Sequence, residues 1–258
     1  MLKRHRIQFP KTESSLNQDE AYFYFQGDGE NRKIRFHDYD EIYRVQGLYE
    51  QIFYERLRCS SPGKVAGILE SAVKQSQDNF SELRILDFGA GNGIMGEELK
   101  KHGVSRLIGV DIIEEAYAAT IRDRPGVYDA YYVEDFTRLN REKREDIESW
   151  QCDCMVTVAA LGFGDIPIKA FIEAFNIIND EGWVAFNIKE TFLDREDDSG
   201  FSRMIRELIF SKYLDVYHLE RYRHRLSIKG EPLFYFAIAG RKRADVSREF
   251  MESKGIDS

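Results

Sequence analysis

Long apolar runs are absent from this sequence. No stretch of about 18 residues is apolar enough to span a bilayer, so we expect no transmembrane helix and no membrane partner. The basic N-terminus, residues 1–6, is not followed by the apolar segment that a secretory signal requires. We therefore expect a cytoplasmic protein.

Cysteine and histidine are scarce, with three and five residues in a chain of 258. Cys59, Cys152 and Cys154 suggest no disulfide framework, and small buried side chains in a reducing compartment are the simplest interpretation. The histidines are scattered and show no Cys/His spacing typical of zinc. We expect no metal site.

An excess of positive charge is also lacking, because the formal net charge is -8. Proteins that read nucleic acid usually carry a basic patch or stripe. Two local basic clusters exist, Arg221, Arg223 and Arg225 and then residues 241–243, but solvated strand faces or strand ends explain them as well. Nucleic acid is therefore the partner class that we expect least.

The sequence does contain enough apolar material for one sizeable core, at 43% hydrophobic residues. From residue 83 onward, predicted strands alternate with predicted helices. The expected strands are 84–88, 106–110, 128–133, 152–159, 183–188, 216–227 and 233–240. The expected helices are 94–102, 114–123, 137–150, 199–210 and one that begins with Asp165 as its N-cap and Pro167 in its first turn. Repeated strand–helix units predict an α/β fold: a doubly wound, mostly parallel seven-stranded sheet that ends in an antiparallel hairpin.

The first 80 residues differ from this pattern. An aromatic segment at 20–26, a turn at 27–31 and a return at 33–36 predict a hairpin, and a helix start follows at 60–62. We divide the chain into an N-terminal cap segment at 1–80, a main domain at 81–243 and a polar, frayed tail at 244–258.

A glycine-rich turn joins the first strand of the main domain to its first helix. Gly89, Gly91 and Gly93 would let the backbone turn tightly and approach a ligand near a helix N-terminus. Three aspartates, Asp87, Asp111 and Asp135, end the first three strands at equal intervals of 24 residues. One strand–helix unit separates each pair, so all three carboxylates should meet at the carboxyl edge of the sheet. At Asp111 a carboxylate could accept both hydroxyls of an adenosine ribose.

Residues 84–190 resemble the cofactor half of class I S-adenosylmethionine (SAM) dependent methyltransferases. Segments 85–93, 109–111 and 133–136 match the first three family motifs, and 152–161 resembles the fourth-strand motif. The hairpin at 216–240 also resembles the family's final strands, whereas residues 180–182 depart from its usual Pro-Gly-Gly. The resemblance implies a transferase that uses SAM and releases S-adenosylhomocysteine.

The resemblance also implies roles for single residues. Asp87 and the loop residues would hold the methionine end of SAM, Asp111 the ribose, and Asp135 with Phe136 the adenine. The full set of expected cofactor contacts is Asp87, Gly89, Ala90, Gly91, Gly93, Asp111, Ile112, Asp135, Phe136, Ala160, Tyr43 and Tyr49.

Two alternatives remain. Residues 91–96 also satisfy Gly-x-Gly-x-x-Gly, which is typical of NAD(P)-binding Rossmann oxidoreductases. The position of Asp87, the third carboxylate and the absence of a large second domain all favour SAM over a nicotinamide. The second alternative is a non-catalytic partner subunit that binds SAM.

The acceptor site should lie over the ends of the fourth and fifth strands, beneath a cap from residues 1–60. Its candidate residues are His37, Asp38, Tyr39, Tyr43 and Tyr49 from the cap and His224 from the hairpin. We expect one or two of the tyrosines to touch the cofactor or the acceptor, and His37, Tyr39 and His224 are the candidate catalytic groups. An aromatic cap on an acidic chain favours a small-molecule acceptor, with protein second and nucleic acid third. The sequence leaves the oligomeric state open.

Overall fold

The computed structural model describes residues 4–11, 20–27, 30–162, 164–193 and 200–256. Its central feature is a seven-stranded sheet in the order β6-β5-β4-β7-β8-β10-β9. Its strands are β4 (Arg84–Phe88), β5 (Arg106–Asp111), β6 (Ala130–Val133), β7 (Cys154–Thr157), β8 (Trp183–Lys189), β9 (Leu214–Leu226) and β10 (Pro232–Lys242). Strands β6, β5, β4, β7 and β8 pair in parallel, and β10 runs antiparallel to both β8 and β9. The predicted α/β sheet with its antiparallel hairpin is confirmed.

Apolar side chains alternate along the central strands, so the sheet carries a core on each face. Ile85 belongs to one core and the next residue, Leu86, to the other. The helices that contribute to these cores are α2 (Ser61–Gln75) and α3 (Ile94–Lys101) on the Ile85 side, and α5 (Arg141–Glu148), α6 (Ile168–Ile177), α7 (Phe201–Phe210) and α8 (Arg248–Ser253) on the Leu86 side. Helix α4 (Glu114–Asp123) packs against a helix of the N-terminal segment. None of the helices described is both long and apolar enough to cross a membrane.

The N-terminal segment forms a second, smaller sheet. Strands β1 (Arg6–Gln8), β2 (Tyr22–Gly27) and β3 (Glu30–Arg35) pair antiparallel in that order. The chain continues into α1 (Tyr39–Arg44) and a π-helical segment, Glu50–Arg56. Buried residues from all of these except β1 form a separate apolar cluster that includes Phe23, Phe36, Ile42, Ile52 and Phe53. The two strands of the expected hairpin are confirmed as β2 and β3, whereas residues 28–29 of the expected turn lie outside the described residues. Strand β1 is an additional strand that the sequence did not indicate.

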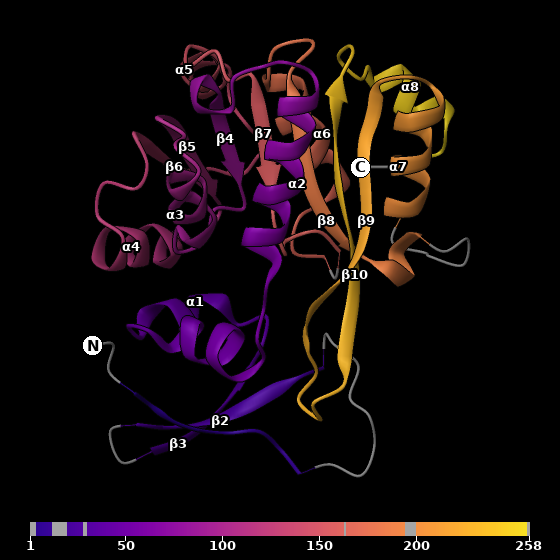
Figure 1. Ribbon diagram of the computed structural model, residues 1–258. Helices are drawn as coiled ribbons and strands as arrows, with labels where there is room; N and C mark the ends of the chain where they lie inside the picture. Colours follow the sequence, from indigo (N-terminus) through magenta and orange to yellow (C-terminus); the bar gives the residue numbers. More distant parts are fainter. Residues whose placement is uncertain (1–3, 12–19, 28–29, 163, 194–199, 257–258) are drawn as a thin grey trace.

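Figure 1 shows where this segment lies: α1, β2 and β3 sit beyond the carboxyl ends of the parallel strands, and the long β9–β10 hairpin extends past that edge beside them. Two backbone hydrogen bonds fasten the hairpin to the chain that leads into α2. The N–H of Ser60 donates to the His224 carbonyl at 2.9 Å, and the N–H of Leu226 donates to the Leu57 carbonyl at 2.7 Å. The carboxyl edge of the sheet is thus enclosed by segments distant in sequence.

The C-terminal residues differ from the expectation of a frayed tail, which is wrong for residues 246–256. Helix α8 begins after Ser247, whose side chain accepts the Phe250 N–H. Val246, Met251 and Ile256 are buried in the core on the Leu86 side. Three apolar residues in a polar stretch are enough to pack a short helix against the domain. Two short 3₁₀ segments, Phe80–Glu82 and Glu190–Leu193, complete the elements described.

Candidate active site

The glycine loop between β4 and α3 is tied to the neighbouring strand. The N–H groups of Gly89 and Ala90 both donate to the Val110 carbonyl at 2.9 Å. Gly91 has a φ of +54°, and a Cβ there would lie 2.6 Å from the hydroxyl oxygen of Tyr43. Only glycine therefore permits both this backbone conformation and the close approach of Tyr43.

Asp111, at the end of β5, fastens the same loop from the other side. Its Oδ2 accepts the N–H of Gly91 at 2.8 Å, and its Oδ1 accepts the N–H of Ile113 at 3.0 Å. Burial raises the pKa of this carboxyl, while the backbone donors at Ile113 and Gly91 oppose the rise. Each carboxylate oxygen has a second lone pair, so Asp111 can still accept hydrogen bonds from a ligand in the adjacent cavity.

Asp87 lies deeper than the sequence suggested. Only 1% of its surface is exposed, and the Tyr128 hydroxyl donates to its Oδ2 at 2.6 Å. Burial raises the pKa of Asp87 to about 7; the Tyr128 hydrogen bond lowers it and the nearby Asp111 raises it further. This carboxyl, held by Tyr128 near the end of β4, therefore has a pKa near neutrality.

Asp135 follows β6 and faces solvent more than the other two carboxylates. Its Oδ1 accepts both the N–H and the hydroxyl of Thr137, at 2.8 and 2.7 Å, and these bonds lower its pKa. The next residue, Phe136, is buried, with its ring centroid 4.8 Å from that of Phe88. An acceptor and an apolar ring thus stand together at this strand end.

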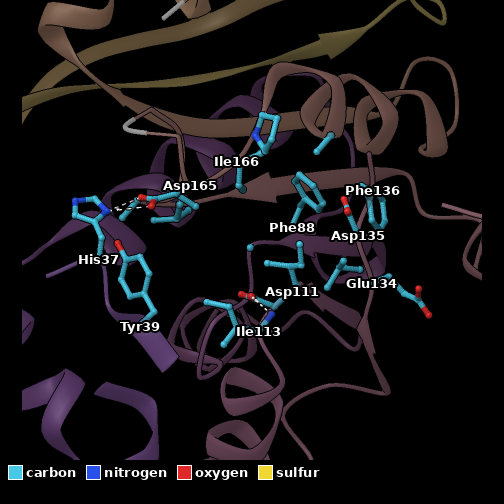
Figure 2. Close-up of a pocket in the computed structure, with 18 of the residues that line it drawn as sticks. His37, Tyr39, Phe88, Asp111, Ile113, Glu134, Asp135, Phe136, Asp165 and Ile166 are labelled. Carbon is cyan, nitrogen blue, oxygen red and sulfur yellow. Dashed lines mark hydrogen bonds and ion pairs between the residues drawn. The ribbon is translucent and has the colours of Figure 1, made fainter. Parts of the chain in front are cut away.

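A cavity of about 240 Å³ opens at the carboxyl ends of β4, β5, β6 and β7. Its walls come from these strand ends, from the loop before α6 and from the N-terminal segment. The lining residues are His37, Tyr39, Tyr43, Tyr49, Phe88, Gly89, Val110, Asp111, Ile112, Ile113, Glu134, Asp135, Phe136, Val158, Ala159, Ala160, Asp165, Ile166, Pro167 and Ala170. Figure 2 shows Asp135 and Phe136 toward one end of this cavity and His37 toward the other.

Three tyrosines from the N-terminal segment form one wall of the cavity. The ring centroids of Tyr39 and Tyr43 lie 6.0 Å apart, and those of Tyr43 and Tyr49 lie 5.1 Å apart. Burial raises the pKa of all three hydroxyls above the usual value, so they remain protonated at neutral pH. Helix α1 is held in place from outside by the Arg44 guanidinium, which donates to Glu115 of α4 at 2.6 Å.

His37 and Asp165 form a pair that the sequence did not predict. The ring nitrogen Nδ1 of His37 lies 3.0 Å from both carboxylate oxygens of Asp165 (Figure 2). The expectation that Asp165 caps α6 is wrong: Pro167 holds the N-cap position, and Asp165 is directed to the histidine instead. Asp38, the adjacent candidate, pairs with Arg35 on the surface and is not part of the cavity wall.

His224 belongs to a buried polar network and not to this cavity. Its Nδ1 lies 2.6 Å from the Ser61 hydroxyl, and its ring stacks on Tyr235 with centroids 4.0 Å apart. Burial lowers the pKa of the imidazole well below its usual value, so the ring is neutral at physiological pH. It lines a smaller recess of about 40 Å³ that adjoins the main cavity and shares five of its lining residues, among them His37 and Asp165.

Most of the sequence-predicted site residues therefore come together. Those in the cavity wall are His37, Tyr39, Tyr43, Tyr49, Gly89, Asp111, Ile112, Asp135, Phe136 and Ala160. Asp87, Ala90, Gly91 and Gly93 are not among the lining residues, and the Tyr43 hydroxyl lies close to Gly91. Asp165, Ile166 and Pro167 are lining residues that sequence reasoning missed, because Asp165-x-Pro167 is also a common way to begin a helix.

Strand order, loop and carboxylates together define a class of protein. The model of a family described as a methyltransferase domain matches residues 61–226. The chain belongs to this family, the class I SAM-dependent methyltransferases, and SAM is its cofactor.

Known relatives agree with this assignment but share limited sequence. Protein arginine N-methyltransferase 1 of Saccharomyces cerevisiae is 30% identical over 83 residues, which cover 32% of this chain and only 21% of that protein. One solved structure is N-methyltransferase NodS of Bradyrhizobium japonicum in complex with S-adenosylhomocysteine. It superposes on this chain with a TM-score of 0.52 at 12% identity, and the match covers 80% of this chain and 97% of NodS. A structure described as a candidate RNA methyltransferase from Pyrococcus horikoshii has a TM-score of 0.52 at 18% identity, covering 72% of this chain and 86% of that one. The two structures share the fold with this protein.

Proposed function

We propose that this methyltransferase transfers the methyl group of SAM to a small-molecule acceptor, inside the cavity that the N-terminal segment encloses. The observation that carries this proposal is the tyrosine wall: Tyr39, Tyr43 and Tyr49 cover one side of the carboxyl edge of the sheet and, with the strand ends, line a partly open cavity of about 240 Å³. Enclosed, largely apolar pockets with a few polar groups suit small ligands. A protein or nucleic-acid acceptor would need a more open approach to the same edge.

The residues present fit the cofactor. Asp111 has unused lone pairs at the cavity wall for the ribose hydroxyls. At the other end, Oδ2 of Asp135 has no hydrogen-bond donor within the described part of the chain, and Ile112 and Phe136 offer apolar surface for an adenine. Asp87 and the loop would stand behind the methionine end, with the Tyr43 hydroxyl against Gly91. We assign these contacts as the cofactor site.

When bound, SAM supplies a methyl group already activated by the sulfonium. The protein's work is then to orient the acceptor atom toward that methyl and to exclude water. An acceptor hydroxyl or amine must also lose a proton, and we assign the His37–Asp165 pair to this task. The Asp165 carboxylate lies 3.0 Å from Nδ1 and so orients the imidazole, as a general base requires.

The test has two arms. Calorimetric titration with S-adenosylhomocysteine, with NAD and NADP as comparison ligands, should show binding of the first alone. Incubation of a cell extract with SAM carrying a radiolabelled methyl group should then label the low-molecular-mass fraction. Binding of NAD without S-adenosylhomocysteine contradicts the cofactor site, and label confined to protein or RNA contradicts the small-molecule acceptor.

A further inference from the structure

Arg225 on β9 is a buried cation without a counter-charge. Its relative exposure is 5%, and the Leu226 carbonyl accepts the only hydrogen bond from its guanidinium within the described residues, at 3.0 Å. No carboxylate of those residues lies within salt-bridge distance of it. The interpretation of Arg225 as part of a solvated strand face is wrong. Arg225 pairs with Leu233 but Arg223 pairs with Phe234, so His224 is the extra residue of a bulge on β9, and the alternation of side chains along β9 changes there. His224 and Arg225 are consequently both buried.

A second buried cation in the same sheet has its charge balanced by carboxylates, in contrast to Arg225. Lys242 on β10 is 1% exposed, and its Nζ contacts the Asp180 carboxylate at 3.3 Å and that of Asp245 at 2.5 Å. It also donates to the Ile178 carbonyl at 2.6 Å. A charge taken out of water is strongly destabilising unless it is paired in this way. Arg225 lacks such a partner within the chain as described.

The guanidinium of Arg225 lines the smaller recess. The rings of Phe36 and Phe53 lie 5.5 and 6.0 Å from its central carbon and line the same space. This recess of about 40 Å³ shares His37, Tyr39, Tyr49, Ala159 and Asp165 with the cofactor-side cavity. Arg225 therefore stands in the wall of an extension that adjoins the space where the acceptor must lie.

The groups around Arg225 do not neutralise it. Burial is the main influence on the pKa of Arg225 and lowers it. Among the groups that oppose this are Cys59, Tyr39 and Tyr49, whose own pKa values are raised by burial, so they are neutral at physiological pH. A guanidinium remains charged even so. Its fork of donors matches a carboxylate, which can accept two parallel hydrogen bonds.

We propose that Arg225 binds the carboxylate of the methyl acceptor, and that the enzyme's substrates are small carboxylic acids. This inference rests on the proposed function, because it assumes that the acceptor occupies the enclosed space. A recess of about 40 Å³ holds a group of carboxylate size and little more. The wall of the recess holds one guanidinium and also the carboxylate of Asp165. It therefore favours a ligand group with a single negative charge over a phosphate dianion, which Asp165 would repel more strongly. With its carboxylate held there, the acceptor's remaining atoms extend past the His37–Asp165 pair toward the methyl donor.

The experiment uses the full chain saturated with S-adenosylhomocysteine, so that the cofactor's own carboxylate site is filled. Acetate, glycine, propionate, benzoate and phenylacetate are titrated against it, each beside the matching primary amide. The variants are Arg225→Met, Arg225→Lys and, as a matched control on the same strand, the exposed Arg223→Met. Binding is followed by calorimetry and by the change in melting temperature.

We expect at least one carboxylate to bind saturably and its amide to bind roughly 10- to 150-fold more weakly, as loss of a charged hydrogen-bonding pair predicts. Arg225→Met should abolish this preference, Arg225→Lys should retain part of it, and Arg223→Met should leave it unchanged. Without ligand, Arg225→Met should melt at or above the wild-type temperature, because it removes an uncompensated buried charge.

Several results would overturn the inference. If S-adenosylhomocysteine binds but no carboxylate binds better than its amide, Arg225 is not an acceptor site, while the methyltransferase assignment stands. A carboxylate preference that survives in Arg225→Met places the anion elsewhere. A large fall in the melting temperature of Arg225→Met, with unchanged carboxylate binding, identifies a purely structural arginine. Failure of S-adenosylhomocysteine to bind at all instead contradicts the proposed function.

Discussion

The Asp111 carboxylate accepts the backbone N–H of Gly91 at 2.8 Å. This bond joins the glycine loop after β4 to the end of β5, so that two consecutive strand–helix units share one polar contact. The same carboxylate lines the cavity. Asp111 therefore both shapes the loop and presents a hydrogen-bond acceptor to a ligand. A substitution at Asp111 should weaken cofactor binding through both roles.

Asp111→Asn should weaken S-adenosylhomocysteine binding by about 10- to 150-fold, because charge-assisted hydrogen bonds to the ribose are lost. Isothermal titration calorimetry measures the dissociation constant. Asp129→Asn is the matched control, since Asp129 also accepts a backbone N–H, that of Leu107 at 2.7 Å, but does not line the cavity. A folded Asp111→Asn protein with wild-type affinity would show that the ribose assignment is wrong.

Gly91→Ala should destabilise the protein more than Gly126→Ala. Both glycines have positive φ, +54° and +74°, so both substitutions add backbone strain of about 1–2 kcal/mol. At Gly126 nothing lies within 4 Å of the new Cβ, whereas at Gly91 it would meet the Tyr43 hydroxyl at 2.6 Å. Urea denaturation of both variants measures the difference.

The excess cost at Gly91 should fall when Tyr43→Phe is combined with Gly91→Ala, because the next atom of Tyr43 is 3.4 Å away. This double-mutant cycle isolates the contact between helix α1 and the loop. Equal costs for Gly91→Ala and Gly126→Ala would mean that Tyr43 does not rest on the loop in solution.

The strands and the carboxyl edge of the sheet, where the cofactor binds, could be predicted because several local sequence patterns agree there. The period of apolar residues, the glycines and the strand-end aspartates all indicate the same α/β arrangement, so Asp111 and Asp135 fall where the sequence placed them. The His37–Asp165 pair joins residues 128 positions apart, and nothing local records such a contact. Arg225 was misjudged for a related reason: the bulge at His224 on its own strand changes which side chains are buried, and a bulge is defined by the pairing with β10, which the local sequence does not show.

The C-terminal helix should contribute measurably to stability. Met251→Ala removes a buried side chain, 8% exposed, from the core on the Leu86 side and should lower the free energy of unfolding by about 2 kcal/mol. Glu252→Ala, at the exposed neighbouring position, should change it by less than about 0.5 kcal/mol. Chemical denaturation compares the two variants. Equal midpoints would mean that residues 246–256 do not pack against the domain in solution.

Asp87 should make both stability and cofactor binding depend on pH near neutrality. Its pKa in the folded protein is about 7, above the ordinary value of 3.8, so the folded state holds a proton that the unfolded state has lost between these values. Stability from this group is therefore fully present below about pH 4 and is lost as the pH rises toward 7. At about 1.4 kcal/mol per pKa unit, the loss is at most about 4 kcal/mol. Asp87→Asn keeps an acceptor for the Tyr128 hydroxyl and should remove this part of the pH dependence.

Cofactor binding shifts the same equilibrium. If the ammonium group of SAM lies over the loop, its positive charge favours the ionised form of Asp87, so binding releases a proton and the affinity rises as the pH passes through about 7. Calorimetry near pH 6.5 in two buffers with different ionisation enthalpies measures this proton directly. The observed enthalpy should differ between buffers for the wild type and agree for Asp87→Asn. Buffer-independent enthalpies in the wild type would place the methionine end of SAM away from Asp87.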